Sequence, residues 1–225
     1  MSTGQRIRIK ICGTTRLADA LCAVDAGVDA LGFIFYQKSP RAIQPQAARA
    51  IIKQLPPFVD AVGVFVDEEL QRVAGIVHEC CLGYVQLHGS ESPAYCRELA
   101  TLVAPCQILK AIRVGEQTTA EDVAFYHNCV RGYLLDTYQK NNVGGTGQTF
   151  DWAIIDRLQI KKTFLLAGGL DIDNIRAALE RVRPYGVDAN SGLEDAPGLK
   201  NHTLIQRFIT TVRAFEADGP SSGQQ

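Results

Sequence analysis

Two residues near the N-terminus have the chemistry of a proton-transfer pair. Lys10 and Cys12 alternate with three isoleucines between residues 7 and 11, and side chains of a β-strand switch faces at every residue, so that every second one lies about 6.6 Å along. The isoleucines fit a helix-covered face, and Lys10 and Cys12 the other. Because an ammonium favours a thiolate, we expect Lys10 to lower the pKa of Cys12 and make it a base or a nucleophile. The alternative is a small cysteine buried in the core.

A carboxylate occupies an equivalent place later in the chain. Asp136 directly follows the apolar run Tyr133-Leu134-Leu135. To act as a general acid it would have to hold a proton near neutral pH, although an aspartate normally ionises near pH 3.9. A desolvated mouth or a neighbouring phosphate would favour the protonated form. The alternative is an aspartate that caps a turn, and the sequence leaves both roles open.

Glycines follow two apolar runs near the C-terminus. Gly168 and Gly169 come after one run, Ser191 and Gly192 after the other, and a helix-like segment follows each pair. Free backbone N–H groups next to a helix N-terminus form a binding site for a phosphate. The glycine-dense segment 142–149, with Gly145 and Gly147, predicts a lid or a further phosphate loop, although a plain surface loop has the same composition.

Four more polar residues are candidates for binding a substrate. Arg41 follows Ser39-Pro40, and its planar guanidinium could hold a carboxylate or be a solvated surface charge. Gln86 and His88 share one face at the end of another run, where His88 could orient hydroxyls, shuttle a proton or be structural. Asp188 lies near the end of the last apolar run.

The elements that must position these groups alternate strictly. Eight runs are typical of strands, with helical periodicity between them: residues 7–12, 30–35, 59–66, 84–88, 107–112, 132–136, 163–167 and 186–190. Helix starts are predicted at Ser92-Pro93, at Thr119 and near Asp171, and a last helix from Asn201. Eight such units predict a single-domain (β/α)₈ TIM barrel over residues 1–217, with a polar, disordered tail at 218–225.

Two other architectures were weighed against the barrel. A doubly wound α/β sheet would more often carry a GxGxxG fingerprint after its first strand, and the turn after residue 12 reads Gly-Thr-Thr. No short-period repeat supports a solenoid. In a barrel, catalytic groups come from the C-terminal ends of the strands, which is where Cys12, His88, Asp136 and Asp188 would lie.

The composition limits the kinds of molecule that the protein is expected to bind. The net charge of −1 gives no basic field for nucleic acid or anionic lipid, so a small phosphorylated ligand is favoured. The seven cysteines are odd in number and mostly lie in apolar stretches, which is typical of reduced thiols. With no apolar run of membrane length and no room for a secretion signal, we expect a cytoplasmic protein. The four histidines lack ligand spacing, so no metal is expected.

These residues together resemble the phosphoribosylanthranilate isomerase family of tryptophan biosynthesis, from about residue 7 to residue 215. The resemblance runs in order through Lys10-Ile11-Cys12-Gly13, Gly32-Phe33-Ile34-Phe35 with Ser39-Pro40-Arg41, Val62-Gly63-Val64-Phe65-Val66, Gln86-Leu87-His88-Gly89, Leu135-Asp136, Gly144-Gly145-Thr146-Gly147 with Phe150-Asp151-Trp152, Leu166-Ala167-Gly168-Gly169-Leu170, and Gly186-Val187-Asp188 with Ser191-Gly192. Thr14 and Ala189-Asn190 depart from the usual pattern without removing a reacting group.

The resemblance implies a TIM-barrel isomerase that performs an Amadori rearrangement of N-(5-phosphoribosyl)anthranilate without a metal or organic cofactor. It implies Cys12 as general base, Asp136 as general acid, Arg41 as the anchor of the anthranilate carboxylate, and the glycine pairs as the phosphate site. A histidine-pathway isomerase or a sugar-phosphate epimerase is the nearest alternative, and a phosphate-binding scaffold a remote one. A monomer and a homodimer both fit the sequence.

Overall fold

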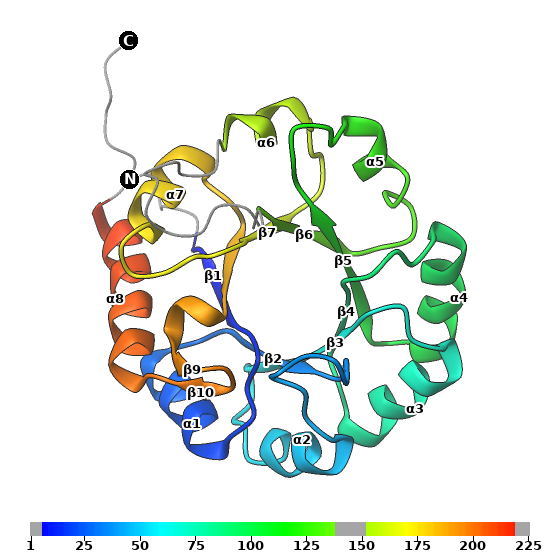
Figure 1. The fold of residues 1–225 in the computed structure, drawn as a ribbon, viewed down its shortest axis with the longest axis horizontal. Helices are drawn as coiled ribbons and strands as arrows, with labels where there is room; N and C mark the ends of the chain where they lie inside the picture. Colours follow the sequence, from blue (N-terminus) through cyan, green and yellow to red (C-terminus); the bar gives the residue numbers. More distant parts are fainter. Residues whose placement is uncertain (1–5, 138–151, 219–225) are drawn as a thin grey trace.

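The main sheet is one closed ring of parallel strands. The computed structural model describes residues 6–137 and 152–218, and Figure 1 shows the ring face-on. Its strands are β1 (Arg8–Ile11), β2 (Ala30–Ile34), β3 (Asp60–Phe65), β4 (Tyr84–Leu87), β5 (Gln107–Arg113), β6 (Gly132–Asp136), β7 (Phe164–Ala167) and β8 (Gly186–Ala189). Because β1 pairs with both β2 and β8, the ring has no edge strand. The predicted barrel is confirmed, and the doubly wound alternative is wrong.

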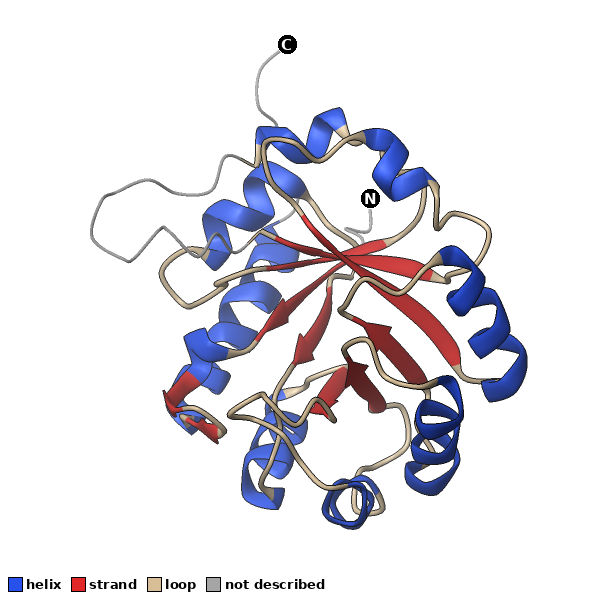
Figure 2. Ribbon diagram, turned by 45° about the vertical axis from the view of Figure 1, so that its right-hand side comes forward, coloured by secondary structure: helices blue, strands red, loops and turns tan. Residues whose placement is uncertain are grey.

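A helix follows each strand and packs on the outside of the ring, as Figure 2 shows with strands in red and helices in blue. The helices are α1 (Leu17–Ala26), α2 (Pro45–Ile52), α3 (Leu70–Cys80), α4 (Pro93–Val103), α5 (Ala120–Ala124), α6 (Ala153–Arg157), α7 (Ile175–Val182) and α8 (His202–Asp218). None of the helices in the described part of the chain is long and apolar enough to cross a membrane.

Local capping explains where several helices begin. The Ser92 hydroxyl accepts the N–H of Tyr95 at 3.2 Å, and Thr119 forms a capping box with Asp122, as predicted. Asp171 instead accepts two N–H groups of a turn that precedes α7, so this helix begins later, at Ile175. Asp218, which was expected in the tail, is the last residue of α8, where its carboxylate pairs with a guanidinium of α7.

Strand alternation divides the apolar residues into two layers. Ile9 and Ile11 belong to the large core between strands and helices, whereas Cys12 packs with Ile34 and Val64 in a smaller cluster. A Cβ added to Gly32 would lie 2.7 Å from the Cys12 Sγ and 3.0 Å from the Lys10 Nζ. Lys10 and Cys12 therefore face the barrel interior, as the alternation predicted.

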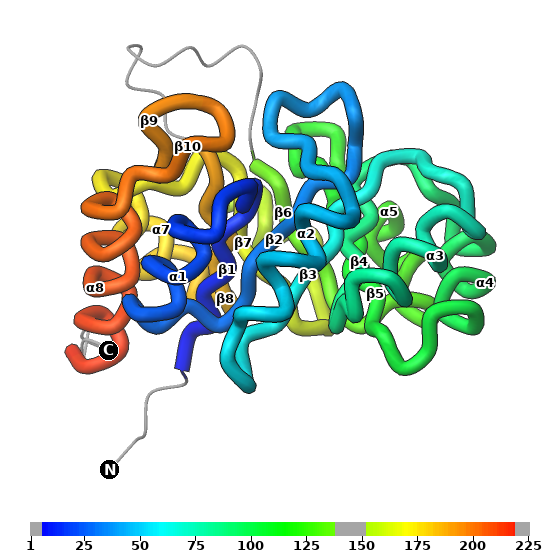
Figure 3. Tube along the Cα trace, turned by 90° about the horizontal axis from the view of Figure 1, so that it is seen from below, coloured from blue at the N-terminus to red at the C-terminus, as the bar shows by residue number. Residues whose placement is uncertain are grey.

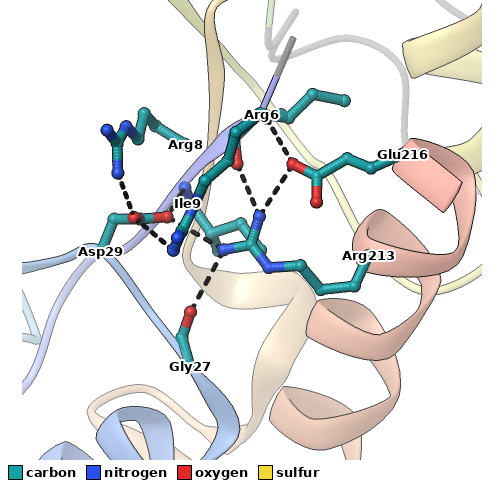
Figure 4. A network of polar contacts seen from close by, with 8 residues as sticks. Arg6, Arg8, Ile9, Gly27, Asp29, Arg213 and Glu216 are labelled. Carbon is teal, nitrogen blue, oxygen red and sulfur yellow. Dashed lines mark hydrogen bonds and ion pairs between the residues drawn. The ribbon is translucent and has the colours of Figure 1, made fainter. Parts of the chain in front are cut away.

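The first and last elements are joined by a polar network at the N-terminal end of β1, drawn in Figure 4. Arg213 of α8 donates to the carbonyl of Ile7 at 2.8 Å, to Glu216 at 2.9 Å and to Asp29 at 3.0 Å. The N–H of Ile7 also donates to Glu216. Burial acts to raise the pKa of Asp29, but hydrogen bonds from Ile9, Arg8 and Arg213 outweigh it and lower the pKa. These contacts fix α8 against the start of β1.

One small element was not predicted from the sequence. Between β8 and α8 the chain forms a 3₁₀ turn, η1 (Ser191–Leu193), and an antiparallel hairpin of β9 (Glu194–Ala196) and β10 (Leu199–Lys200). In Figure 3 the hairpin and the loop after β2 lie on the same side of the barrel, the side away from the N-terminus. The hairpin therefore belongs to the end of the barrel where the strands terminate.

Candidate active site

Cys12 follows β1 directly and lies at the barrel mouth. Its N–H donates to the carbonyl of Ala189 at 2.9 Å, which extends the ladder between β1 and β8 by one residue. The side chain is only 5% exposed. The glycine at position 32 gives the thiol its room, because any side chain there would displace Sγ. The first predicted reacting group is thus held rigidly by sheet pairing on one side and close packing on the other.

The prediction that Cys12 has a lowered pKa is wrong. Burial is the largest influence and raises the pKa of the thiol, the charge of Lys10 lowers it, Asp188 raises it and Lys200 lowers it again, with a net rise. The sequence revealed the neighbouring ammonium but not the loss of water around the sulfur. The thiol therefore depends on its two cations to ionise, and the thiolate, once formed, is a strong base.

Lys10 and Asp188 form a buried ion pair beneath the mouth. Their side chains face each other across the β1–β8 pairing, with Nζ 2.8 Å from Oδ2 and exposures of 2% and 7%. Burial acts to lower the pKa of Lys10, but the charges of Asp188 and Cys12 outweigh it and raise the pKa. Burial raises the pKa of Asp188, and Lys10 only partly offsets this. Oδ1 of Asp188 has no hydrogen-bond partner among the described residues, so it can accept a ligand hydroxyl.

A chain of hydrogen bonds links Gln86, His88 and Asp136. Gln86 Nε2 lies 3.2 Å from His88 Nδ1, and His88 Nε2 lies 3.1 Å from Asp136 Oδ2. An amide nitrogen can only donate, so Nδ1 accepts and Nε2 carries the proton that points at Asp136. Gln86 Oε1 is buried and has no partner within residues 6–137 and 152–218. The three predicted residues of β4 and β6 are brought together, and Arg113 of β5 is paired in register beside Asp136.

Arg41 is not the free surface charge that its sequence context allowed. Its Nε lies 3.0 Å and 2.9 Å from the two oxygens of Glu194, and Nη2 lies 2.7 Å from Oε2. Glu194 in turn accepts from Lys200 Nζ at 2.9 Å. Sequence reasoning missed Glu194 and Lys200, because charged residues between a strand and a helix have the pattern of ordinary surface residues.

The two predicted glycine loops lie side by side. A Cβ on Gly192 would lie 2.8 Å from the Cβ of Asp171, next to the loop that holds Gly168 and Gly169. These last two glycines have φ values of +96° and +75°, which a residue with a side chain rarely adopts. In the part of the chain that the structure describes, the N–H groups of Gly168, Gly169, Ser191 and Gly192 form no hydrogen bonds. They can therefore be donated to an anion.

The remaining predictions concern two glycines of the proposed phosphate site and the binding of a metal ion. Gly145 and Gly147 lie outside the described residues. Within residues 6–137 and 152–218, no three His, Cys, Asp or Glu side chains gather closely enough to hold a metal ion.

Comparisons with known proteins show the family to which the chain belongs. The sequence profile of the N-(5'-phosphoribosyl)anthranilate (PRA) isomerase family matches residues 9–211. The chain belongs to this family. The PRA isomerase of Pelobacter propionicus is 46% identical over 212 residues, which cover 94% of this chain and 98% of that relative. The family that the sequence motifs resembled is thereby confirmed.

Solved PRA isomerases share the fold over nearly the whole chain. A structure of monomers of the dimeric enzyme from Thermotoga maritima has a TM-score of 0.79 and 38% identity, and it covers 92% of this chain and 98% of its own. Another, in complex with reduced 1-(o-carboxyphenylamino)-1-deoxyribulose 5-phosphate, has a TM-score of 0.77 and 40% identity, with coverages of 92% and 99%.

Proposed function

We propose that the protein is an isomerase of tryptophan biosynthesis that converts N-(5'-phosphoribosyl)anthranilate into 1-(2-carboxyphenylamino)-1-deoxyribulose 5-phosphate. The observation that carries this proposal is the placement, at one barrel mouth, of a buried thiol beside Lys10 and of the Asp136 carboxyl group, which His88 contacts. An Amadori rearrangement needs one group that gives a proton and another that takes one. Membership of the PRA isomerase family supports the same reaction.

Asp136 is the general acid of the proposed first step. It gives a proton to the furanose ring oxygen, the bond between C1 and that oxygen breaks, and an iminium forms with the anthranilate nitrogen. The His88 Nε2, 3.1 Å from Oδ2, holds the carboxyl in place at the end of β6. The iminium nitrogen is the electron sink for the next step, so the reaction needs no metal or organic cofactor.

Cys12 is the general base of the second step. Its thiolate takes the C2 proton, and the electron pair of that C–H bond forms the enolamine. The enolamine then tautomerises to the ketone by taking up one proton at C1 and losing one from its C2 hydroxyl. The raised pKa of the thiol makes the thiolate a competent base for a carbon acid. Lys10 and Lys200 supply the positive charge that lets it form. Over the two steps the substrate gains protons at the ring oxygen and at C1 and loses them from C2 and its hydroxyl, so the isomerisation is balanced.

The ends of the substrate match the remaining groups. The bare N–H groups of the two glycine loops suit the 5'-phosphate. Oδ1 of Asp188 and Oε1 of Gln86 are buried acceptors that ribose hydroxyls would satisfy. Arg41 keeps an edge of its guanidinium for the anthranilate carboxylate.

The decisive assay follows the fluorescence of phosphoribosylanthranilate as it is consumed. We expect Cys12→Ala and Asp136→Asn each to lower kcat by about two orders of magnitude or more, the scale of a positioned proton-transfer group. Cys81→Ala and Asp25→Asn are matched controls, because both side chains are exposed and lie away from the mouth. Circular dichroism of each variant checks that the fold persists.

A near-parental rate in either variant would remove that residue from its role. The histidine-pathway substrate, which undergoes the same rearrangement, serves as a competitor. Faster turnover of that substrate than of phosphoribosylanthranilate would replace the proposed function by the alternative one. We further propose that the protein is cytoplasmic. We propose that it works as a monomer or a homodimer, and light scattering in solution distinguishes these two states.

A further inference from the structure

Glu194 holds only one of the two edges of the Arg41 guanidinium. A guanidinium can grip a carboxylate through Nε and Nη2 or through Nη1 and Nη2. Glu194 takes the first edge, with contacts of 2.7 to 3.0 Å. Nη1 has no hydrogen bond within the described ranges. Since Arg41 is 18% exposed and Glu194 only 3%, the partner lies on the protein side and leaves the outer edge of the guanidinium for a ligand.

Lys200 holds Glu194 from the buried side. Its Nζ lies 2.9 Å from Glu194 Oε1, 3.1 Å from the Asn190 carbonyl and 2.9 Å from Asn190 Oδ1. The N–H of Gly198 donates to the same Oε1 at 3.2 Å. The Lys200 side chain is 1% exposed, so all three oxygens around it belong to the protein. Lys200 of β10 therefore holds Glu194 in place, and Glu194 in turn holds Arg41.

The charges of this cluster do not cancel. Burial acts to raise the pKa of Glu194, but hydrogen bonds from Arg41 and Lys200 outweigh it and lower the pKa, so Glu194 is ionised. Burial lowers the pKa of Lys200, and its hydrogen bond to Glu194 acts to raise it. With Lys200 protonated, one carboxylate between two cations leaves a surplus of one positive charge. An Arg41–Glu194 pair alone would be neutral, and binding a second carboxylate to it would leave a net charge of −1. Lys200 keeps the cluster attractive to an anion.

The cluster also reaches the other end of the proposed substrate site. Asn190 directly precedes Ser191 and Gly192, whose N–H groups suit the phosphate. A Cβ on Gly13 would lie 2.7 Å from Asn190 Oδ1 and 2.8 Å from Arg41 Cδ, so the two side chains pack against the same bare backbone. One buried ammonium thus sets the spacing between a carboxylate anchor and a phosphate loop.

We infer that Glu194 and Lys200 are positioning residues that hold Arg41 with its outer edge open, and that they set the preference for a substrate bearing a carboxylate. This inference rests on the proposed function, in which Arg41 binds the anthranilate carboxylate. If the three residues only stabilised the β9–β10 hairpin, substrates with and without that group would respond alike to their substitution.

The test compares phosphoribosylanthranilate with the analogue made by condensing aniline with ribose 5-phosphate, which lacks the carboxylate. Glu194→Asp keeps the charge but shortens the reach, and Lys200→Met removes the charge but keeps the stem. We expect each to raise KM for phosphoribosylanthranilate about tenfold, because a small displacement of a binding group costs that much. The constant for the analogue, measured as KM or as an inhibition constant, should change less than twofold.

Two further variants separate the possible failures. Arg41→Ala should weaken phosphoribosylanthranilate roughly 100-fold, since it removes charged hydrogen bonds, and spare the analogue. Glu91→Asp alters an equally buried pair, with Lys110 at 3.0 Å, that does not contact Arg41. It should leave the ratio between the two substrates unchanged.

Equal rises in KM for both substrates in Glu194→Asp and Lys200→Met, with a selective rise in Arg41→Ala, would overturn the positioning role and leave the proposed function intact. The comparison uses KM because Lys200 also supports the Cys12 thiolate, so that Lys200→Met can lower kcat for both substrates. No selective loss in Arg41→Ala would overturn the carboxylate anchor and this inference together. Should one of the two variants fail to fold, the other still decides the outcome, because charge and reach are altered separately.

Discussion

The two ends of β1 carry similar ion pairs and use them differently. At the N-terminal end, Asp29 accepts on both oxygens, Oδ1 from Arg6 and Arg8 and Oδ2 from Ile9 and Arg213 (Figure 4). At the other end, Asp188 pairs with Lys10 through Oδ2, and Oδ1 has no partner among the described residues. A fully bonded carboxylate stabilises the fold, whereas a buried one with a spare acceptor is costly unless a ligand completes it.

A large cavity does not by itself mark the proposed site. A cavity of about 850 Å³ opens at the N-terminal end and is lined by Arg8, Tyr84 and Tyr185 among others. The proposed reacting groups, Cys12 and Asp136, nevertheless lie at the opposite end, where the strands terminate. The unfinished hydrogen bonding of buried groups is therefore a better guide to the chemistry here than the volume of a hollow.

The sharpest way to test this comparison is to break the Lys10–Asp188 pair from each side. Lys10 lowers the pKa of Cys12 and Asp188 raises it. In Lys10→Met the thiolate should form only at higher pH, so the rising limb of kcat/KM should move upward and kcat/KM at pH 7 should fall about tenfold to 100-fold. In Asp188→Asn the same limb should move to lower pH.

The opposite signs are the decisive readout, measured as kcat/KM between pH 5 and 10. Loss of packing alone would lower the rate in both variants without moving the limb in opposite directions. Two limbs that move the same way would show that the pair does not act through the thiol.

The N-terminal network should respond in stability instead of rate. Asp29→Asn keeps the shape but weakens hydrogen bonds to three guanidinium groups, so we expect the free energy of unfolding at pH 7 to fall by about 2 kcal/mol with kcat unchanged. Because folding lowers the pKa of Asp29, its contribution is present above the unfolded-state pKa and is lost as the pH falls through the folded-state value. Urea unfolding at pH 7 and pH 3 should therefore show the difference between parent and variant shrinking in acid.

Asp60 offers a matched control for Asp29 at the same end of the barrel. Burial raises the pKa of Asp60, and the charge of Asp29 raises it further although Arg8 lowers it. Asp60→Asn should accordingly leave stability at pH 7 unchanged or increase it. A large loss in this variant would mean that any change at this end of the barrel is damaging, and Asp29 would have no special part.

The sequence predicted the local structure of the molecule well, but it did not predict the contacts between residues far apart in the chain. Alternation and capping are local, and they placed the boundaries of the eight barrel strands within one residue and put Cys12 on the interior face. The partner of Arg41 lies 153 residues away in a hairpin that no periodicity indicated. The pKa of Cys12 had the wrong sign because spacing shows a neighbouring charge but not desolvation. Contacts between distant loops, and the loss of water they cause, arise only when the ring closes.

The prediction with the smallest expected effect compares an exposed ion pair with a more buried one that has the same N–O distance. Arg176 pairs with Asp218 at 3.0 Å, the same distance at which Arg213 meets Asp29, but its side chain is 53% exposed against 27% for Arg213. Water screens the exposed pair, so Arg176→Ala should leave both the melting temperature and kcat unchanged. Arg213→Ala should lower the melting temperature, because it removes the side-chain donor from the Ile7 and Gly27 carbonyls and one donor each from Asp29 and Glu216. Equal shifts of the two melting curves, measured side by side by calorimetry, would show that pair distance decides stability in this barrel and that the completeness of the buried network does not.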